Sequence, residues 1–163
     1  MRRPSAGRFP TTSEVREARR VTSDLRYEWR GEISDAELVA LTESHGGTPE
    51  AGWWDRVRPH SLGWVTARCA DGRAVGFVNV AWDGGNHAFL IDTKVRSDLQ
   101  RRGIGTQLAR IATDSARHAG CEWLHVDFRD ELRAFYFEAC GFEPTTAGLI
   151  ALRAISGVQR KRV

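Results

Sequence analysis

The hydrophobic positions in the middle of the chain fall into three strand-like runs, at residues 62–69, 74–82 and 88–95. Asp71-Gly72 separates the first two runs, and Asp83-Gly84-Gly85-Asn86 separates the last two. Runs rich in Val, Phe and Trp that are joined by such turn residues are typical of β-hairpins. The pattern therefore predicts an antiparallel meander of three strands.

After Gly103 the spacing of the apolar residues becomes three or four, as in an amphipathic helix. The apolar face comprises Ile104, Leu108, Ile111, Ala112, Ser115 and Ala119. This helix is expected to end at Gly120, and residues 123–128 then read as a further strand. Because a strand, a helix and a strand in this order favour a right-handed crossover with parallel strands, the sheet is predicted to be mixed.

The residues before the meander predict an edge strand and a capped helix. Residues 25–30 alternate bulky and polar side chains, and Ser34-Asp35-Ala36-Glu37 has the pattern of a capping box. The helix is expected to end at Gly46-Gly47. Trp53-Trp54 follows in a segment containing Pro and Gly, which indicates a lid or an irregular helix.

The last part of the domain predicts a second helix and a closing hairpin. Asp130 is expected to cap the helix, Gly141 to end it, and Ala147-Gly148 to form the hairpin turn. The inward face of this helix is predicted to comprise Leu132, Phe135, Tyr136 and Ala139. The expected fold is α+β, with a mixed, mainly antiparallel sheet of six to seven strands and helices on both faces.

The net charge of +3 lies in the two ends of the chain. Residues 1–24 and residues 156–163 each contribute +3, which leaves a mildly acidic body. We therefore expect a mobile Arg-rich segment at residues 1–23, a single domain at 24–155 and a basic tail at 156–163. A dedicated nucleic-acid reader is not expected, because the body has no basic stripe of its own.

Composition places the chain among globular proteins. Hydrophobic residues make up 41%, and no run of about 20 apolar residues could form a membrane span. The three cysteines form no C-x-x-C pair and are expected to be reduced thiols. A cytoplasmic protein without a membrane partner is expected, and a homodimer is left open.

No metal site is predicted, because His45, His60, His87 and His118 lack ligand-like spacing with Cys or acidic residues.

The segment Gln100-Arg101-Arg102-Gly103-Ile104-Gly105-Thr106 lies between a strand and the long helix. Its backbone N–H groups would then be the unpaired donors of a helix N-terminus, which attract anions. Glycine at 103 and 105 keeps side chains away from these donors, and Arg101 and Arg102 add positive charge. A dinucleotide fingerprint would need Gly or Ala where Leu108 stands, and the Gly-Lys-Ser/Thr of a P-loop is absent.

Residues 95–109 resemble the acetyl-CoA pyrophosphate motif of the GNAT acyltransferases, Q/R-x-x-G-x-G/A. A second match follows downstream, where Tyr136-Phe137-Glu138-Ala139-Cys140-Gly141-Phe142 resembles the family's F-Y-E-x-x-G-F segment. The resemblance covers about residues 24–153, since the order of the expected elements also matches. It implies an N-acetyltransferase that uses acetyl-CoA to acetylate a primary amine of a small molecule or peptide by direct attack.

The resemblance also implies which residues contact acetyl-CoA. The backbone of Val95 would pair with the pantetheine arm. The N–H groups of the following loop and helix start would hold the pyrophosphate. The implied cofactor residues are Val95, Gln100, Arg101, Arg102, Gly103, Ile104, Gly105 and Thr106.

Activation of the amine is the harder proton transfer in this reaction. An alkylammonium with a pKa near 10.4 is deprotonated in only roughly one molecule in two thousand at pH 7, which costs about 4.6 kcal/mol. His125 is the first candidate for the base, since it matches a position where some family members carry Glu. Asp92, acting directly or through a water, is the second. Alternatively, His125 makes a structural hydrogen bond and Asp92 pairs with Lys94 or an arginine.

The general acid is less clear from the sequence. Phe137 occupies the position where many family members carry the tyrosine that acts as general acid, and the phenylalanine side chain has no acidic proton to donate. Tyr136 is a candidate acid, although it matches the family's core-aromatic position. Cys140 or water could also protonate the thiolate. Since the coenzyme thiol has a pKa near 8.5, loss of the acid is tolerable.

Two other functions remain open. A catalytically weak or inactive coenzyme A-binding module, used for sensing or assembly, is compatible with Phe137. An RNA or ribosome partner with basic tails would show salt-sensitive association that requires both chain ends. The acceptor amine is not encoded in any motif. Trp53 and Trp54 are expected to be mainly core residues.

Overall fold

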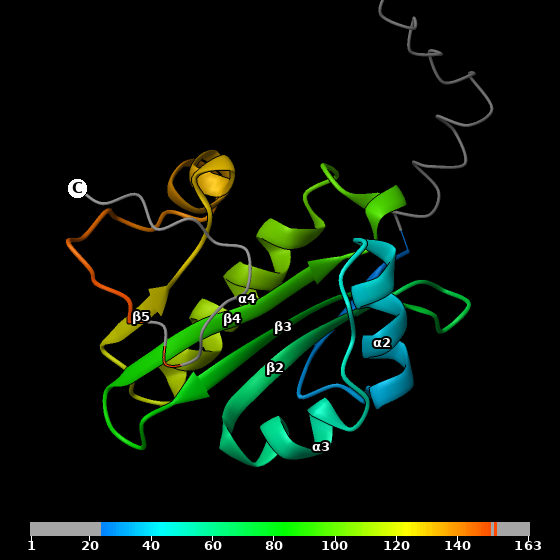
Figure 1. Ribbon diagram of the computed structural model, residues 1–163, viewed down its shortest axis with the longest axis horizontal. Coiled ribbons are helices and arrows are strands. Elements are labelled where there is room, and N and C mark those ends of the chain that lie inside the picture. The colour runs from blue at the N-terminus through cyan, green and yellow to red at the C-terminus, as the bar shows by residue number, and fades with distance from the viewer. Residues whose placement is uncertain (1–23, 151, 153–163) are drawn as a thin grey trace, which may run out of the picture.

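The computed structural model describes residues 24–150 and 152, which form one five-stranded sheet in the order β1-β2-β3-β4-β5 (Figure 1). The predicted meander is confirmed, with register shifts of the kind found at β-bulges. The predicted mixed sheet is confirmed too, because β5 pairs parallel with β4. The strands are β1 (Arg26–Trp29), β2 (Ser61–Arg68), β3 (Ala74–Trp82), β4 (His87–Val95) and β5 (Trp123–Val126).

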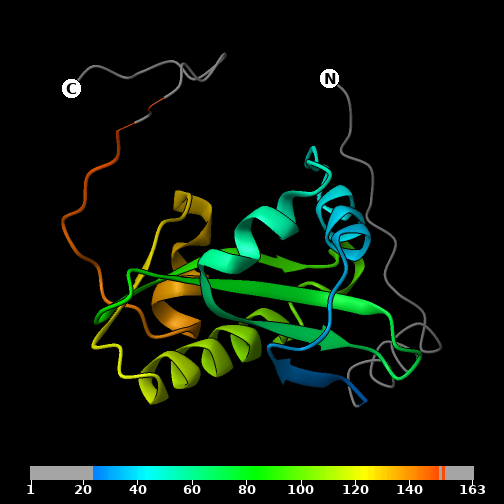
Figure 2. The same ribbon diagram turned by 90° about the horizontal axis from the view of Figure 1, so that it is seen from below.

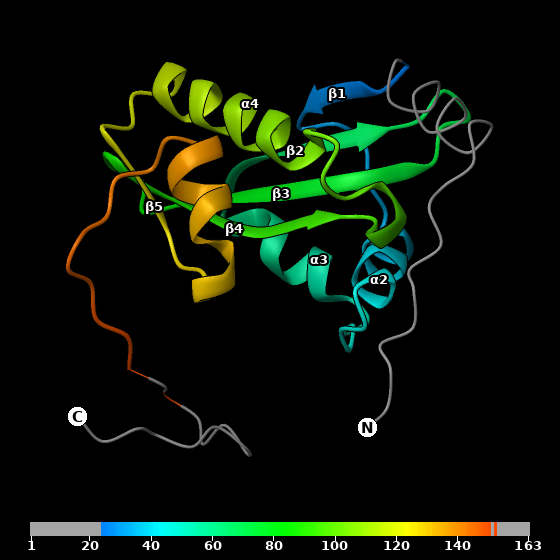
Figure 3. The same ribbon diagram turned by 90° about the horizontal axis from the view of Figure 1, so that it is seen from above.

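Helices cover both faces of the sheet, as Figures 2 and 3 show. The long helix α4 (Ile104–His118) packs on one face, and α2 (Asp35–Ser44) and α3 (Trp53–Val57) lie on the other. The main core lies under α4, where Leu108 and Ala112 are fully buried against strand residues such as Val78. A second core under α2 and α3 contains Trp54, which is only 2% exposed. Trp54 is therefore a core residue, as expected.

Helix α2 begins at the predicted capping box. The Ser34 hydroxyl accepts a hydrogen bond from the Glu37 N–H, and the Glu37 carboxylate accepts one from the Ser34 N–H at 2.9 Å. Glu37 also forms an ion pair with Arg68 of β2, with an N–O distance of 2.5 Å. The hydrogen bond from Arg68 lowers the pKa of Glu37 from 4.5 to about 2. One carboxylate therefore caps α2 and ties it to the sheet.

We expect Glu37→Gln to lower the free energy of unfolding at pH 7 by about 1–3 kcal/mol, since Gln keeps the cap but loses the ion pair. The folded-state pKa of Glu37 is depressed, so its contribution is complete above the unfolded pKa of 4.5 and is lost as the pH falls toward 2. Urea denaturation across this range should show the variant and the parent converging in acid. A difference that stays constant with pH would contradict this assignment.

Strand β4 contains a β-bulge near its end. Two residues, Asp92 and Thr93, lie opposite the single Val78 of β3, because Ile91 pairs with Asn79 and Lys94 pairs with Phe77. Asp92 has a φ of 55°, in the left-handed region that few non-glycine residues adopt. The bulge lies just beyond the residues that pair with β5, so it changes the direction of β4 where the two strands part.

The second helix differs from its prediction. Asp130 does not cap an α-helix, since residues Asp130–Leu132 form a 3-10 turn, η3, and Ala134–Ala139 form a π-helix, η4. A π-helix turns less per residue than an α-helix, so the inward face changes. Tyr136 is buried and Phe135 is partly buried, as predicted, whereas Leu132 and Ala139 are exposed.

The prediction of six to seven strands is not confirmed. Within the described part of the chain, residues 141–150 form no strand, and Leu149 and Ile150 are 86% and 83% exposed. The turn signal at Ala147-Gly148 alone forms no hairpin there, because a strand needs a partner for its backbone groups. The far side of that hairpin lies mostly outside the described residues. The proposed chain-end segments 1–23 and 156–163 lie outside them as well, and the domain limits remain predictions.

Candidate active site

The N-terminus of α4 has exposed backbone donors. Gly103 is the N-cap residue, no side chain caps this end, and the first turn holds no acidic residue. The free N–H groups and the helix dipole therefore favour an anion here. Ile104 points into the core and is 2% exposed, so only its backbone is available to a ligand. Gln100, Arg101, Arg102 and Thr106 lie in the same loop and first turn, as predicted.

The two glycines of this loop have different surroundings. Gly103 has a φ of 80°, and a Cβ atom there would have no atom within 4 Å. At Gly105 a Cβ would lie 3.1 Å from the Phe135 ring and 3.7 Å from Val95 Cγ2. Gly103 thus keeps the approach to the helix start open, and Gly105 lets η4 and the end of β4 pack against α4. These features fit a diphosphate group at Gly103.

Gln100 connects the loop before α4 to the end of β4 and to the end of α2. Its Nε2 donates to the Val95 carbonyl at 3.4 Å and to His45 Nδ1 at 3.1 Å. His45 is the C-cap residue of α2, and burial together with nearby Lys94 lowers its pKa. The imidazole is therefore neutral near pH 7 and can accept this bond. His45 is exposed, and no local signal in the sequence could reveal its contact with Gln100, which lies 55 positions away.

Strands β4 and β5 diverge beyond Leu90 and Val126, the last residues that they pair. Tyr136 of η4 reaches this point, where its hydroxyl lies 3.3 Å from Thr93 Oγ1. Its ring stacks on Phe128 and packs edge-on against Phe135 and Phe142. Burial raises the pKa of Tyr136, so the phenol keeps its proton at neutral pH. Tyr136 is thus a core residue whose hydroxyl donates a hydrogen bond to Thr93 of β4.

Cys140 and Phe137 are the two residues near Tyr136 that also bear on the choice of a general acid. Burial raises the pKa of the Cys140 thiol to about 11, and it also raises the pKa of the Tyr136 phenol, so both groups are weaker acids than the coenzyme thiol and acidity does not separate them. Phe137 contacts the guanidinium of Arg133 and the ring of Phe128, and it carries no acidic proton. Tyr136 remains the first candidate for the acid because of its position, since its hydroxyl lies beside Thr93 of β4.

Asp92 lines a cavity of about 270 Å³ between α2, α3 and β4. The ammonium group of Lys94 lies 3.7 Å from the Asp92 carboxylate and 4.7 Å from the centre of the Trp53 ring. Asp35 and Glu50 also line this cavity, so carboxylates outnumber the single lysine. The lining therefore has more negative than positive charge, which favours a cationic group in the cavity.

His125 lies on β5 directly beside Phe89 of β4, one residue before the strands part. The rings of His125 and Phe89 are stacked, with centroids 4.8 Å apart and planes 21° apart. His87 Nδ1 lies 2.8 Å from His125 Nε2. No local signal indicates this pair, because 38 positions separate the two histidines and only the parallel register of β4 and β5 brings them together.

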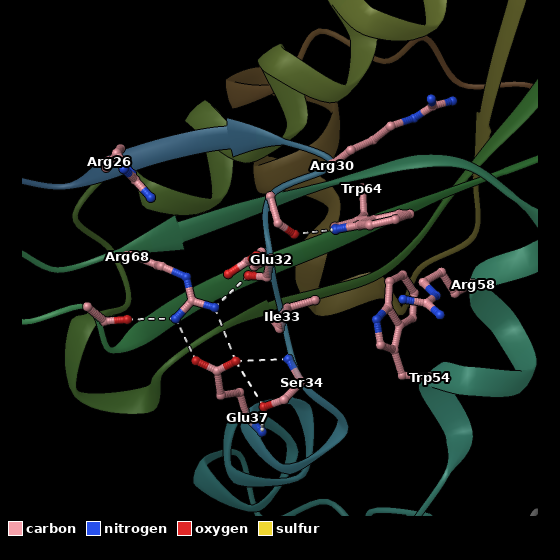
Figure 4. Close-up of a pocket in the computed structure, with 12 residues that line it drawn as sticks. Arg26, Arg30, Glu32, Ile33, Ser34, Glu37, Trp54, Arg58, Trp64 and Arg68 are labelled. Atoms are coloured by element: carbon pink, nitrogen blue, oxygen red, sulfur yellow. Dashed lines mark hydrogen bonds and ion pairs between the residues drawn. The ribbon is translucent and has the colours of Figure 1, made fainter.

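A second cavity, of about 780 Å³, lies at the opposite edge of the sheet between β1, β2 and the start of α2 (Figure 4). Its polar groups mostly bind one another. Arg68 is held by Glu37 and by the carbonyls of Glu32 and Gly72, and the Trp64 indole donates to the Gly31 carbonyl. We therefore assign this cavity to the packing of β1 and α2. The candidate site lies beside β4 and β5.

No set of three or more His, Cys, Asp or Glu side chains between residues 24 and 150 is arranged to hold a metal ion. In the same part of the chain, no helix combines the length and apolarity needed to cross a membrane.

Comparison with known proteins agrees with this geometry. The profile of the acetyltransferase (GNAT) family matches residues 25–142. No match is found among curated proteins. A structure from Deinococcus radiodurans R1, described as a candidate acetyltransferase, is 25% identical and has a TM-score of 0.64. The alignment covers 80% of this chain and 90% of the other.

Two more solved structures share the fold. A GNAT family acetyltransferase from Streptococcus pneumoniae TIGR4 is 22% identical, with a TM-score of 0.64 and coverage of 80% of this chain and 99% of the other. An aminoglycoside N-acetyltransferase, AAC(6')-Iy, solved in complex with CoA, is 19% identical, with a TM-score of 0.62 and coverage of 80% and 95%. Because the family profile spans most of the chain, this protein belongs to the GNAT family of acetyltransferases.

Proposed function

We propose that this protein transfers an acetyl group from acetyl-CoA to a primary amine of a small molecule or peptide. The observation that carries the proposal is the uncapped N-terminus of α4, with open space at Gly103, in a chain of the GNAT family. A CoA complex of a protein with the same fold supports a CoA-type substrate.

The cofactor would lie along the loop that joins β4 and α4. Backbone N–H groups at residues 101–106 would bind its pyrophosphate, and the exposed side chains of Arg101 and Arg102 would add positive charge. The Val95 carbonyl now accepts a bond from Gln100 Nε2. Binding of the pantetheine arm at Val95 would replace this weak 3.4 Å contact, and Gln100 would keep its bond to His45.

His125 is the proposed base, and Asp92 is the second candidate. The protonated amine loses one proton to the base, its nitrogen forms a bond to the acyl carbon, and a second proton leaves the nitrogen as the neutral amide forms. The carbon–sulfur bond breaks, and the electron pair leaves with sulfur as a thiolate. Tyr136 is the proposed donor of a proton to that thiolate, since its hydroxyl lies where β4 and β5 part. A base or acid in position contributes about 10²- to 10⁴-fold to the rate.

The acceptor would enter from the face covered by α2 and α3. The cavity beside Asp92 lies on this face, and its excess of carboxylates suits a positively charged group. Amines that carry a second cation are therefore the acceptors we expect to bind best.

Release of CoA from acetyl-CoA, measured with a panel of monoamines, diamines and peptides, tests the proposal. Turnover that requires an amine, together with an acetylated product by mass spectrometry, is the expected result. A second candidate function is a CoA-binding module without catalysis, which Phe137 and the burial of Tyr136 favour. Tight binding of acetyl-CoA with no product across the panel would support that second function.

A further inference from the structure

The contact between His87 and His125 is an edge-to-edge hydrogen bond. The two nitrogens are 2.8 Å apart, the ring centroids are 5.1 Å apart and the planes differ by 19°. The centroid distance exceeds the N–N distance by about two ring radii. Two nearly coplanar rings with this separation meet edge to edge rather than face to face. One ring therefore donates its N–H to the lone pair of the other.

We propose that His87 is a positioning residue that holds His125 in the tautomer needed for a base, an inference that rests on the proposed function. In this arrangement His125 donates its Nε2–H to His87 Nδ1. The lone pair of His125 is then on Nδ1, where it can take a proton from the acceptor amine. His87 acts through His125 and does not contact the substrate.

Tautomer preference decides the direction of this hydrogen bond. If His125 is the donor, both rings carry their remaining proton on Nε2, which is the more stable form of a free histidine side chain. If His87 is the donor, both rings must carry the proton on Nδ1, which is less stable. In that second arrangement the Nε2 lone pair of His125 is occupied by the hydrogen bond, and no lone pair is left for a substrate.

Phe89 fixes the plane in which the hydrogen bond forms. It lies directly across from His125 in the parallel register, and the two rings stack with their centroids 4.8 Å apart. His87 lies two residues earlier on the same face of β4, opposite Trp123. Stacking on Phe89 stops the His125 ring from tilting, and His87 stops it from rotating. Together these contacts hold an exposed imidazole in one orientation beside the point where β4 and β5 part.

The tautomer can be tested without any acceptor. In protein labelled with ¹⁵N-histidine, a spectrum that correlates ring nitrogens with ring carbon-bound protons should show His125 with a protonated Nε2 and an unprotonated Nδ1. In His87→Leu this preference should weaken. A parent His125 that carries its proton on Nδ1 would overturn the inference. That result would leave acetyl transfer itself untouched.

Kinetics provide the second test. We expect His87→Leu to lower kcat on the order of tenfold, the effect that loss of a hydrogen-bond partner has on metal-bound histidines, with no change in the KM for acetyl-CoA. His87→Asn should restore much of kcat, because the Asn oxygen can accept the same hydrogen bond. His60→Leu is the matched control, since His60 is exposed in the turn η1 (Arg58–His60) before β2.

The outcomes separate this inference from the proposed base. If His125→Gln lowers kcat but His87→Leu behaves like His60→Leu, the role of His87 is wrong and the base assignment stands. If His125→Gln retains full activity, His125 is not the base, and the positioning role fails with it. A loss of activity in His87→Leu that His87→Asn does not restore would indicate a packing role and would also contradict the inference.

Discussion

Gly103→Glu should weaken the binding of coenzyme A by about 100-fold or more, measured by titration calorimetry. The new side chain would start from a position with no atom within 4 Å, at the helix end where the diphosphate is expected. A carboxylate about 5 Å from one phosphate charge costs roughly 3 kcal/mol at an effective dielectric constant near 20, and each 1.4 kcal/mol is a factor of ten. Charge repulsion alone therefore accounts for the expected loss.

Gly120→Glu is the control for backbone strain and folding. Gly120 follows the other end of α4, has a φ of 93°, and also has no atom within 4 Å of an added Cβ. The two variants therefore carry the same side chain at similar backbone angles on one helix. Both should lose similar thermal stability, and only Gly103→Glu should lose coenzyme A. Undiminished affinity in a folded Gly103→Glu protein would refute the proposed cofactor site.

His125→Gln should lower kcat by about 10²- to 10⁴-fold, because Gln cannot accept the amine proton. The KM for acetyl-CoA should stay close to that of the parent, since His125 lies on β5 and the cofactor loop follows β4. Steady-state rates with the best amine of the panel would measure both constants. His118→Gln, at an exposed position on α4, is the control for loss of an imidazole.

Asp92→Asn distinguishes the two candidate bases. If His125 is the base, this variant should mainly raise the KM for the amine, because it removes a carboxylate from the acceptor cavity. If Asp92 is the base, kcat should fall instead, and His125→Gln should keep most of its activity. The second result would reverse the order in which we rank them.

The secondary structure was largely predictable, because local signals determine it. The capping box at Ser34 places the start of α2, and the turn residues after Cys69 and Trp82 separate the strands of the meander. Gly103 and Gly120 bound α4, and both have positive φ angles. The cofactor loop was predictable for the same reason, since its glycines and arginines are contiguous in the sequence.

The rest depends on contacts between distant residues. His87 and His45 have no distinguishing neighbours, and they gain partners only through the parallel pairing of β4 with β5 and the packing of α2 near the loop. The π-helix was also not predictable, because an amphipathic pattern near Tyr136 fits an α-helix equally well. The proposed acceptor cavity depends on the bulge at Asp92, which no residue type in β4 signals.

Because of the bulge, Asp92 affects both the stability of the fold and the proposed reaction. A left-handed backbone costs a non-glycine residue about 1–3 kcal/mol, although aspartate tolerates it better than most side chains do. Glycine at position 92 would relieve this cost, so Asp92→Gly should raise the melting temperature. The same change would remove a carboxylate that faces Lys94. A selection for heat resistance alone would therefore tend to discard a group that the proposed reaction uses.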